Sequence, residues 1–179
     1  MIKIVDMNSR RNPFGVSEFV MPVKRIAERL EPCSVVHYSE ITHLKPARCS
    51  RVIITGTALM DHESLEKGDF KWLETIQRPV LGICAGMQAI AKHFGSPMTR
   101  YPEIGMHKIQ PVVRNRILRA EINAYLLHTV GVRPSRNFDV IAGSSRCAYA
   151  IKHREKEIYG VMFHPEVRNP EIIENFISL

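Results

Sequence analysis

The sequence predicts an α/β fold: a three-layer sandwich with a mostly parallel central sheet and a small antiparallel extension. Short β-branched apolar runs alternate with helical patterns in the first half of the chain, whereas the second half carries several short strands in succession. Such alternation is typical of a parallel sheet covered on both faces, and the later strands account for the extension. With 179 residues, 45% of them hydrophobic, we expect one domain over residues 1–179.

In the first half, apolar runs mark the strands and helical spacing marks the helices. An apolar stripe from Phe19 to Leu30 predicts a helix that starts or kinks near Pro22. The predicted strands are Ile2–Val5, Ser34–Tyr38, Arg51–Thr55 and Pro79–Ile83, and two further helices are expected over Asp69–Ile76 and Met87–Phe94.

In the second half, the predicted strands are Ile109–Val113, Phe138–Gly143, Ala148–His153 and Ile158–Phe163. The chain then closes with a helical pattern, for which Asn169 is suited to the N-cap and Pro170 to the first helical position. In sheets of this type the reacting groups collect at the carboxyl ends of the parallel strands.

Composition excludes several classes of protein. No apolar run approaches the roughly 18 residues of a membrane span and the start MIKIVDM lacks a signal-peptide pattern, so we expect no membrane association and a cytoplasmic location. The four cysteines show no metal or disulfide spacing, and we expect neither metal nor cofactor. The net charge is +7, but the basic residues are scattered without interleaved aromatics, so we expect no nucleic-acid role.

The stretch LGICAGMQ places Cys84 between two glycines, after an apolar strand and before a helical segment. This is the pattern of a nucleophile elbow, where small neighbours permit a sharp strand-to-helix turn. The helix N-terminus stabilises a thiolate, and the N–H of Ala85 is suited to an oxyanion hole. The alternative is an inert buried cysteine, and the elbow pattern by itself does not decide between them.

The stretch GVMFHPE supplies a base and its partner in one segment. Because His164 and Glu166 are two residues apart, an extended backbone would place both side chains on the same side, where the imidazole can bond the thiol and the carboxylate. Pro165 disfavours a helical conformation for His164. Six other histidines are interpreted as ordinary surface or core groups, and such a role for His164 is the alternative here; the six are His37, His43, His62, His93, His107 and His153.

Together, LGICAGMQ and GVMFHPEV resemble the class I glutamine amidotransferase family, whose G-[IV]-C-x-G-x-Q and F-H-P-E patterns they match in order. The resemblance covers nearly the whole chain and implies a flavodoxin-like fold. It implies that Cys84 attacks the side-chain amide of L-glutamine to give a thioester and ammonia. His164 is implied as the proton carrier, Glu166 as its support, the Ala85 N–H as half of the oxyanion hole and Gln88 as a glutamine contact.

Two other family elements depart from the common pattern. The glycine-rich S-G-G-P loop is replaced by ITGTALMD, in which Gly56 is the candidate for the second oxyanion donor or merely turns the chain. The substrate loop S-H-x-D-x-V is replaced by LLHTVGV, which keeps His128 and lacks the aspartate. Thr129 and Val130 are the substrate contacts that the resemblance implies, largely through backbone groups.

The resemblance also implies a partner, because ammonia must reach a separate synthase subunit. The segment IKHREKEIYGVMFHPEV is most similar to the glutaminase subunit of a two-chain GMP synthase, whereas LHTV is typical of the anthranilate or aminodeoxychorismate branch. We favour the first. Two alternatives stay open: hydrolysis of γ-glutamyl conjugates by the same triad, and a catalytically silent regulatory homologue.

Overall fold

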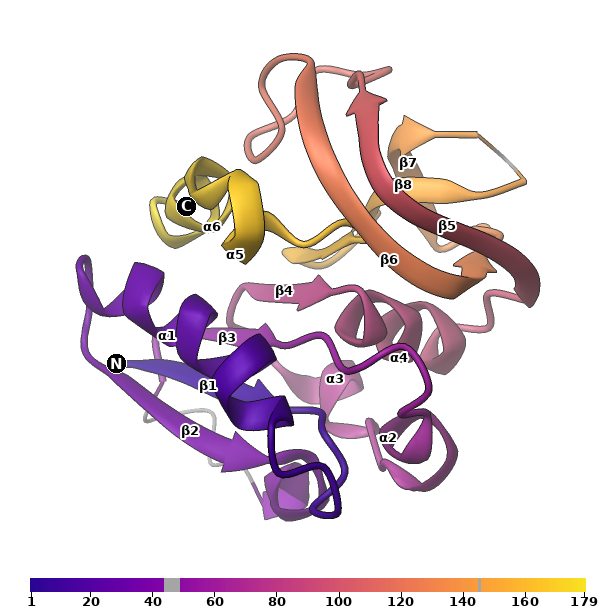
Figure 1. The fold of residues 1–179 in the computed structure, drawn as a ribbon. Helices are drawn as coiled ribbons and strands as arrows, with labels where there is room; N and C mark the ends of the chain where they lie inside the picture. Colours follow the sequence, from indigo (N-terminus) through magenta and orange to yellow (C-terminus); the bar gives the residue numbers. More distant parts are fainter. Residues whose placement is uncertain (44–48, 145) are drawn as a thin grey trace.

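We describe the protein from a computed structural model, which defines residues 1–43, 49–144 and 146–179. Within these ranges, seven strands form a central sheet in the order β2-β1-β3-β4-β9-β8-β7 (Figure 1). The strands are β1 (Ile2–Asp6), β2 (Cys33–His37), β3 (Arg51–Ile54), β4 (Val80–Ile83), β7 (Phe138–Gly143), β8 (Ala148–His153) and β9 (Ile158–Val161).

Five neighbouring strands of this sheet, β2, β1, β3, β4 and β9, pair in parallel. At the edge next to β9, strands β8 and β7 are added in antiparallel pairing. A separate antiparallel pair is formed by β5 (Met98–Ile109) and β6 (Ile122–Val132). The predicted fold class, a mostly parallel sheet with a small antiparallel extension, is therefore confirmed.

Helices complete the layers around the sheet. They are η1 (Val16–Val20), α1 (Met21–Glu28), η2 (Tyr38–His43), α2 (Glu63–Lys67), α3 (Trp72–Thr75), α4 (Ala85–His93), α5 (Pro165–Arg168) and α6 (Pro170–Ile177). Helices α1, α5 and α6 pack together, while α4 packs on β4, β9 and α2 (Figure 1). These two groups form the helical layers of the sandwich.

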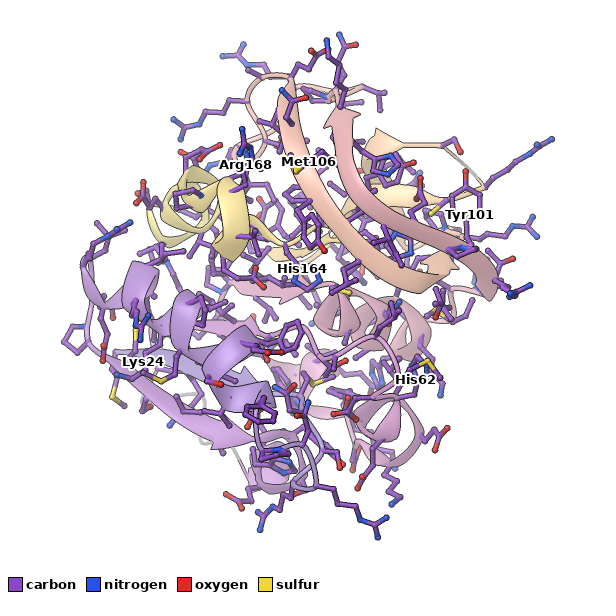
Figure 2. All side chains as sticks on the ribbon, viewed as in Figure 1. Lys24, His62, Tyr101, Met106, His164 and Arg168 are labelled. Carbon is purple, nitrogen blue, oxygen red and sulfur yellow. The ribbon has the colours of Figure 1, made fainter. Side chains whose placement is uncertain are left out.

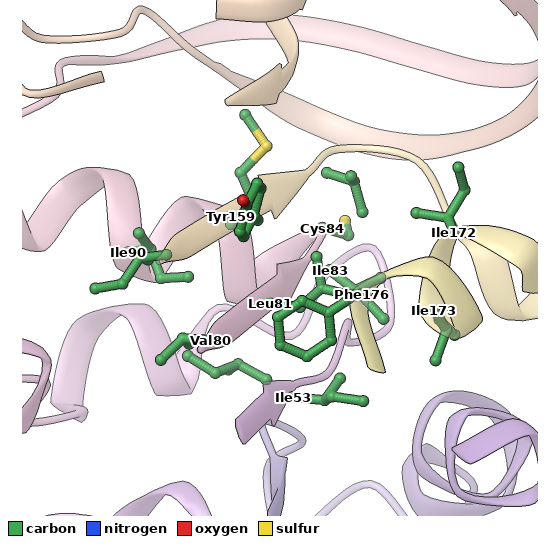
Figure 3. Packing of buried hydrophobic residues seen from close by; sticks show 14 of the residues in the cluster. Ile53, Val80, Leu81, Ile83, Cys84, Ile90, Tyr159, Ile172, Ile173 and Phe176 are labelled. Atoms are coloured by element: carbon green, nitrogen blue, oxygen red, sulfur yellow. The ribbon is translucent and has the colours of Figure 1, made fainter. Parts of the chain in front are cut away.

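The centre of the core lies around β4. Leu81 and Ile83 are fully buried and belong to the same apolar cluster as Ile53 of β3 and Phe176 of α6 (Figure 3). Burying each such side chain contributes roughly 1.5–3 kcal/mol. The core thus fixes the end of β4, from which Cys84 emerges.

Three sequence-based predictions for the second half and for one helix need correction. Residues 110–113 are not in a strand, and of the predicted strand only Ile109 belongs to β5. Residues 126–132, expected as a loop, lie within β6. The first error arises because pairing of β5 with β6 ends at Ile109, and Pro111, which cannot donate to a ladder, follows. The second arises because LLHTVGV is interpreted from the family's substrate loop, whereas pairing with β5 makes it a strand.

The helix predicted over Asp69–Ile76 is shorter and covers Trp72–Thr75. The carboxylate of Asp69 accepts a hydrogen bond from the backbone N–H of Lys71 at 3.0 Å, a local turn that competes with helix. The first predicted helix is divided into η1 and α1, with Pro22 in the first turn of α1. The closing helix starts at Pro170, as predicted.

A search of the described residues for membrane-spanning helices finds none of sufficient length and apolar character.

Candidate active site

Cys84 lies on a sharp turn between β4 and α4. Its backbone has φ +48° and ψ −103°, and no other non-glycine residue in the described ranges has a positive φ. A methyl group on Gly82 would lie 2.5 Å from the carbonyl carbon of Gly86, so the two ends of the turn touch and require glycine. Strain of this kind is typical of a nucleophile elbow. Helix α4 begins at Ala85 and directs its N-terminus towards the sulphur.

His164 follows β9 and forms a short hydrogen bond with Glu166, with 2.7 Å between Nδ1 and Oε1. Both side chains are 1% exposed. The pairing differs in one respect from the expected geometry. The segment is not extended, because Pro165 starts α5 and places Glu166 in its first turn, while His164 itself stays outside the helix at φ −102° and ψ 89°. The turn, rather than a strand, brings the two side chains together.

The imidazole of His164 and the side chain of Cys84 meet at Gly56, just after β3. A methyl group on Gly56 would lie 2.7 Å from Cε1 of His164 and 3.5 Å from Cβ of Cys84. Phe19 covers the imidazole, with 5.8 Å between the ring centroids. Gly56 is therefore a close-approach residue: a side chain there would push the histidine away from the cysteine.

The pKa of His164 reflects this environment. Burial lowers it, but the negative charges of Cys84 and Glu166, together with the hydrogen bond to Glu166, outweigh burial and raise the pKa well above its ordinary value. Nδ1 is occupied by Glu166, so the solvent-shielded Nε2 is the nitrogen left for the sulphur. The arrangement favours the charged form of the imidazole.

Strand β6 forms a wall over this pair. The thiol of Cys84 donates to the carbonyl of Leu127, with 3.6 Å between Sγ and O. Nε2 of Gln88 donates to the carbonyl of Val130 at 2.7 Å. The backbone N–H of His164 donates to the carbonyl of Tyr125 at 2.9 Å. In Figure 2 His164 lies where the β5–β6 hairpin faces the N-terminal helices.

The predicted oxyanion donors lie at one corner of the site. Gly56 follows β3, Ala85 begins α4, and a methyl group on Gly86 would lie 2.4 Å from the carbonyl oxygen of Ile54. The start of α4 is thus pressed against the end of β3. The hydroxyl of Thr57 donates to the carbonyl of Asp61 at 3.0 Å, which closes the loop that replaces the glycine-rich one.

A comparison with known families decides what this geometry belongs to. The sequence model described as "Glutamine amidotransferase class-I" matches residues 20–178. The chain belongs to this family. The resemblance found in LGICAGMQ and GVMFHPEV is confirmed by a match over nearly the whole length.

Individual amidotransferase relatives point the same way. The chain is 31% identical to a "GMP synthase [glutamine-hydrolyzing]" of Ruminiclostridium cellulolyticum, covering 99% of this chain and 36% of that protein. It is 38% identical to one subunit of a "GMP synthase [glutamine-hydrolyzing]" of Pyrococcus abyssi, covering 76% of this chain and 78% of that one. This chain therefore spans about a third of the first relative and most of the second.

A solved structure described as that of a putative GMP synthase subunit from Thermoplasma acidophilum is similar over 99% of this chain and 92% of its own, with 25% identity and a TM-score of 0.79. A glutamine amidotransferase from Thermotoga maritima, 18% identical with a TM-score of 0.69, shares the fold.

The amidotransferase site is nearly closed in this conformation. The cavity above Cys84 has a volume of about 20 Å³, room for about one water. The cavity is lined by residues 57–59, His62, Ala85, Gln88 and residues 127–129. A larger hollow of about 580 Å³ includes Ala58 and His62 as well, so it lies against the same loop. A molecule of the size of an amino acid can reach the sulphur only after the loop or the β6 wall has moved.

Burial raises the pKa of the other three cysteines, to about 11 for Cys33 and Cys147 and in the same direction for Cys49, so these thiols stay protonated at neutral pH. Among the residues that the structure describes, no three His, Cys, Asp or Glu side chains are grouped as metal ligands would be. Sequence reasoning missed Tyr125 and Leu127, which contribute through backbone carbonyls and therefore carry no side-chain signal.

Proposed function

We propose that this chain hydrolyses the side-chain amide of L-glutamine and supplies the ammonia to a synthase subunit. The observation that supports it most is the convergence of Cys84, His164 and Glu166, with the pKa of His164 raised by its two partners over the opposing effect of burial. Family membership supports the same activity. Residues 1–179 act in this proposal as one glutaminase domain.

In the proposed reaction, the Cys84 thiolate attacks the amide carbon of glutamine. The C–S bond forms, the C–N bond breaks, and the His164 imidazolium gives its proton to the departing nitrogen, which leaves as ammonia. His164 then takes a proton from water, and the resulting hydroxide opens the thioester to release glutamate and the thiolate. Glu166 keeps the imidazole oriented and stabilises its charged form.

The remaining predicted residues take binding roles. The backbone N–H groups of Gly56 and Ala85 are proposed to hold the oxyanion, because they lie at one corner beside the sulphur. Gln88, Thr129 and Val130 are proposed as contacts of the glutamine, whose entry would displace the present bond between Gln88 and the Val130 carbonyl. The loop at residues 54–61 differs in sequence from the usual glycine-rich loop, but in this proposal the N–H groups of Gly56 and Ala85 still serve as the two donors.

The acceptor of the ammonia is proposed to be the nucleotide substrate of a GMP synthase. Support comes from the relatives named as single subunits of a GMP synthase, of which this chain covers 78% in one case and 74% in another. In this proposal the chain is the glutaminase subunit of a two-chain enzyme, and the second chain carries the amination. A cytoplasmic location belongs to the same proposal and is testable by imaging a tagged chain.

Cys84→Ala tests the proposal directly. The variant should abolish glutamine-dependent amination by the reconstituted pair, while added ammonium still drives the synthase subunit. Loss of the ammonium-driven reaction as well would contradict the assignment of Cys84 to ammonia release.

Two measurements separate the alternatives. Faster hydrolysis of γ-glutamyl peptides than of glutamine would instead favour a γ-glutamyl hydrolase. Failure of the intact chain, with its partner present, to be labelled at Cys84 by an electrophilic glutamine analogue would favour a silent homologue.

A further inference from the structure

A second buried polar cluster includes His128 of the β6 wall and has no part in the proposed chemistry. The hydroxyl of Tyr149 donates to Oε1 of Glu103 at 2.8 Å. The other carboxylate oxygen, Oε2, lies 3.5 Å from Nε2 of His128. The side chains of Glu103 and His128 are 12% and 1% exposed. The three residues come from β5, β6 and β8, so the cluster ties the hairpin to the main sheet.

The cluster sits where the pairing of β5 with β6 is interrupted. Arg100 lies opposite Val130 and Glu103 lies opposite His128, which leaves two residues of β5, Tyr101 and Pro102, opposite one of β6. Proline cannot donate to the ladder, so backbone bonding is weakened there. Bulges of this kind are frequent next to active sites, where they aim a strand.

The front of the same stretch faces the reactive groups. The carbonyl of Leu127 accepts from the Cys84 thiol, and the carbonyl of Val130 accepts from Gln88. Residues 127–130 therefore contact the site, and His128 within them also lies against Glu103.

We propose that Glu103 is a positioning residue: held by Tyr149, it fixes His128 and so sets residues 127–130 against Cys84 and Gln88. The proposal rests on the proposed function, because the positioned stretch is the wall of the glutamine pocket. Burial, and then Glu103, raise the pKa of the Tyr149 hydroxyl, which keeps it protonated as a donor. The geometry assigns Glu103 a role in binding rather than in proton transfer.

The test compares Glu103→Gln with Glu121→Gln. Glu121 precedes β6 and pairs with Lys108 of the same hairpin at 3.5 Å, with its side chain 49% exposed, so it is a matched control that leaves the cluster intact. Tyr149→Phe, which removes a single hydroxyl, is the second variant in case Glu103→Gln folds poorly. Hydrogen exchange of the amides of residues 127–130 and labelling of Cys84 by a diazo-ketone analogue of glutamine are measured on each chain.

In Glu103→Gln we expect exchange at residues 127–130 to become about tenfold faster, since the negative charge that accepts from Tyr149 and lies 3.5 Å from His128 is lost. The concentration of analogue for half-maximal labelling should rise about tenfold, with the maximal labelling rate changed less than twofold. Tyr149→Phe should raise the exchange rate and the half-maximal labelling concentration as well, whereas Glu121→Gln should change neither of these two quantities. A small neutral alkylating reagent should modify Cys84 at an unchanged rate, which a general loosening of the fold would not allow.

Unchanged exchange in Glu103→Gln and Tyr149→Phe would overturn the proposal, as would faster exchange with unchanged half-maximal labelling. A parent chain that is not labelled even with its synthase subunit would instead refute the proposed function, while exchange still reports whether Glu103 holds the wall.

Discussion

Two buried histidine–carboxylate pairs lie in and next to the candidate active site, and they differ in how closely each pair is joined. In the first, His164 and Glu166 share a hydrogen bond of 2.7 Å. In the second, His128 and Glu103 lie 3.5 Å apart, without the geometry of a hydrogen bond. Both imidazoles are almost fully buried. The comparison separates the effect of burial from the effect of a bonded partner.

The two pKa values move in opposite directions. Burial lowers the pKa of His128, and the charge of Glu103 is too weakly coupled to reverse this. Burial also lowers the pKa of His164, but the Cys84 charge, the Glu166 charge and the hydrogen bond to Glu166 raise it well above the ordinary value. A carboxylate nearby is therefore not enough to charge a buried imidazole; a directional bond and a second anion are needed.

The largest expected difference between the pairs is in catalysis. His164→Gln should lower kcat for glutamine hydrolysis by about 10³-fold, because the proton carrier is lost. His128→Gln should lower kcat by less than about tenfold, the cost of a displaced wall rather than of a lost base. Glutamate release by the chain with its synthase subunit measures both. Equal losses in kcat would abolish the distinction drawn between the two pairs.

The carboxylate partners should show a smaller contrast in the same direction. Glu166→Gln should reduce kcat by about 10²-fold, since the imidazole loses the acceptor that orients it and stabilises its charge. Glu103→Gln should act on the glutamine concentration for half-maximal rate and leave kcat nearly unchanged. Steady-state kinetics on both variants separate the two parameters, and a fall in kcat for Glu103→Gln would place it in the chemistry.

The next prediction concerns the pKa of His164 itself. Cys84→Ser removes the thiolate, the largest influence that raises this pKa, so the value should fall. Glu166→Gln should lower it as well, because it removes the second negative charge beside the imidazole. Titration of the imidazole by nuclear magnetic resonance measures both. An unchanged pKa in Cys84→Ser would show that the sulphur and the imidazole are not coupled.

The helices and strands that could be predicted from the sequence are those that carry a local pattern of residue types. The parallel strands and α4 were predictable because β-branched runs and helical spacing are local patterns, and α4 follows directly from the turn at Cys84. Strand β5 was not, because its stability comes from pairing with β6 and not from its own composition. Helix α5 has only four residues, too few for a periodic signal.

The same distinction applies to the site. Cys84, His164 and Glu166 could be named because their side chains stand in two recognisable motifs, and the structure brings them together. Glu103 stands in no motif, and its relation to His128 depends on a register shift that only the paired strands reveal. The opposite pKa shifts were also inaccessible, because they depend on distances rather than on residue types.

The smallest expected effect is on stability as a function of pH. Because the folded pKa of His128 lies below the ordinary value of 6.5, the unfolded chain binds more protons between these two values. The neutral imidazole therefore contributes stability that is present above about pH 6.5 and lost as the pH falls through that window. The contribution of His164 to stability has the opposite sign: it is present below about pH 6.5 and lost as the pH rises through its raised pKa.

Denaturant unfolding of His128→Gln, compared with the parent at about pH 8 and about pH 5, isolates the contribution of His128. The variant should lose less stability than the parent on acidification, whereas Thr129→Ser, which removes no titratable group, should follow the parent. A variant that loses as much as the parent would mean that folding does not lower the pKa of His128, and burial would then not oppose the charge of this imidazole as proposed.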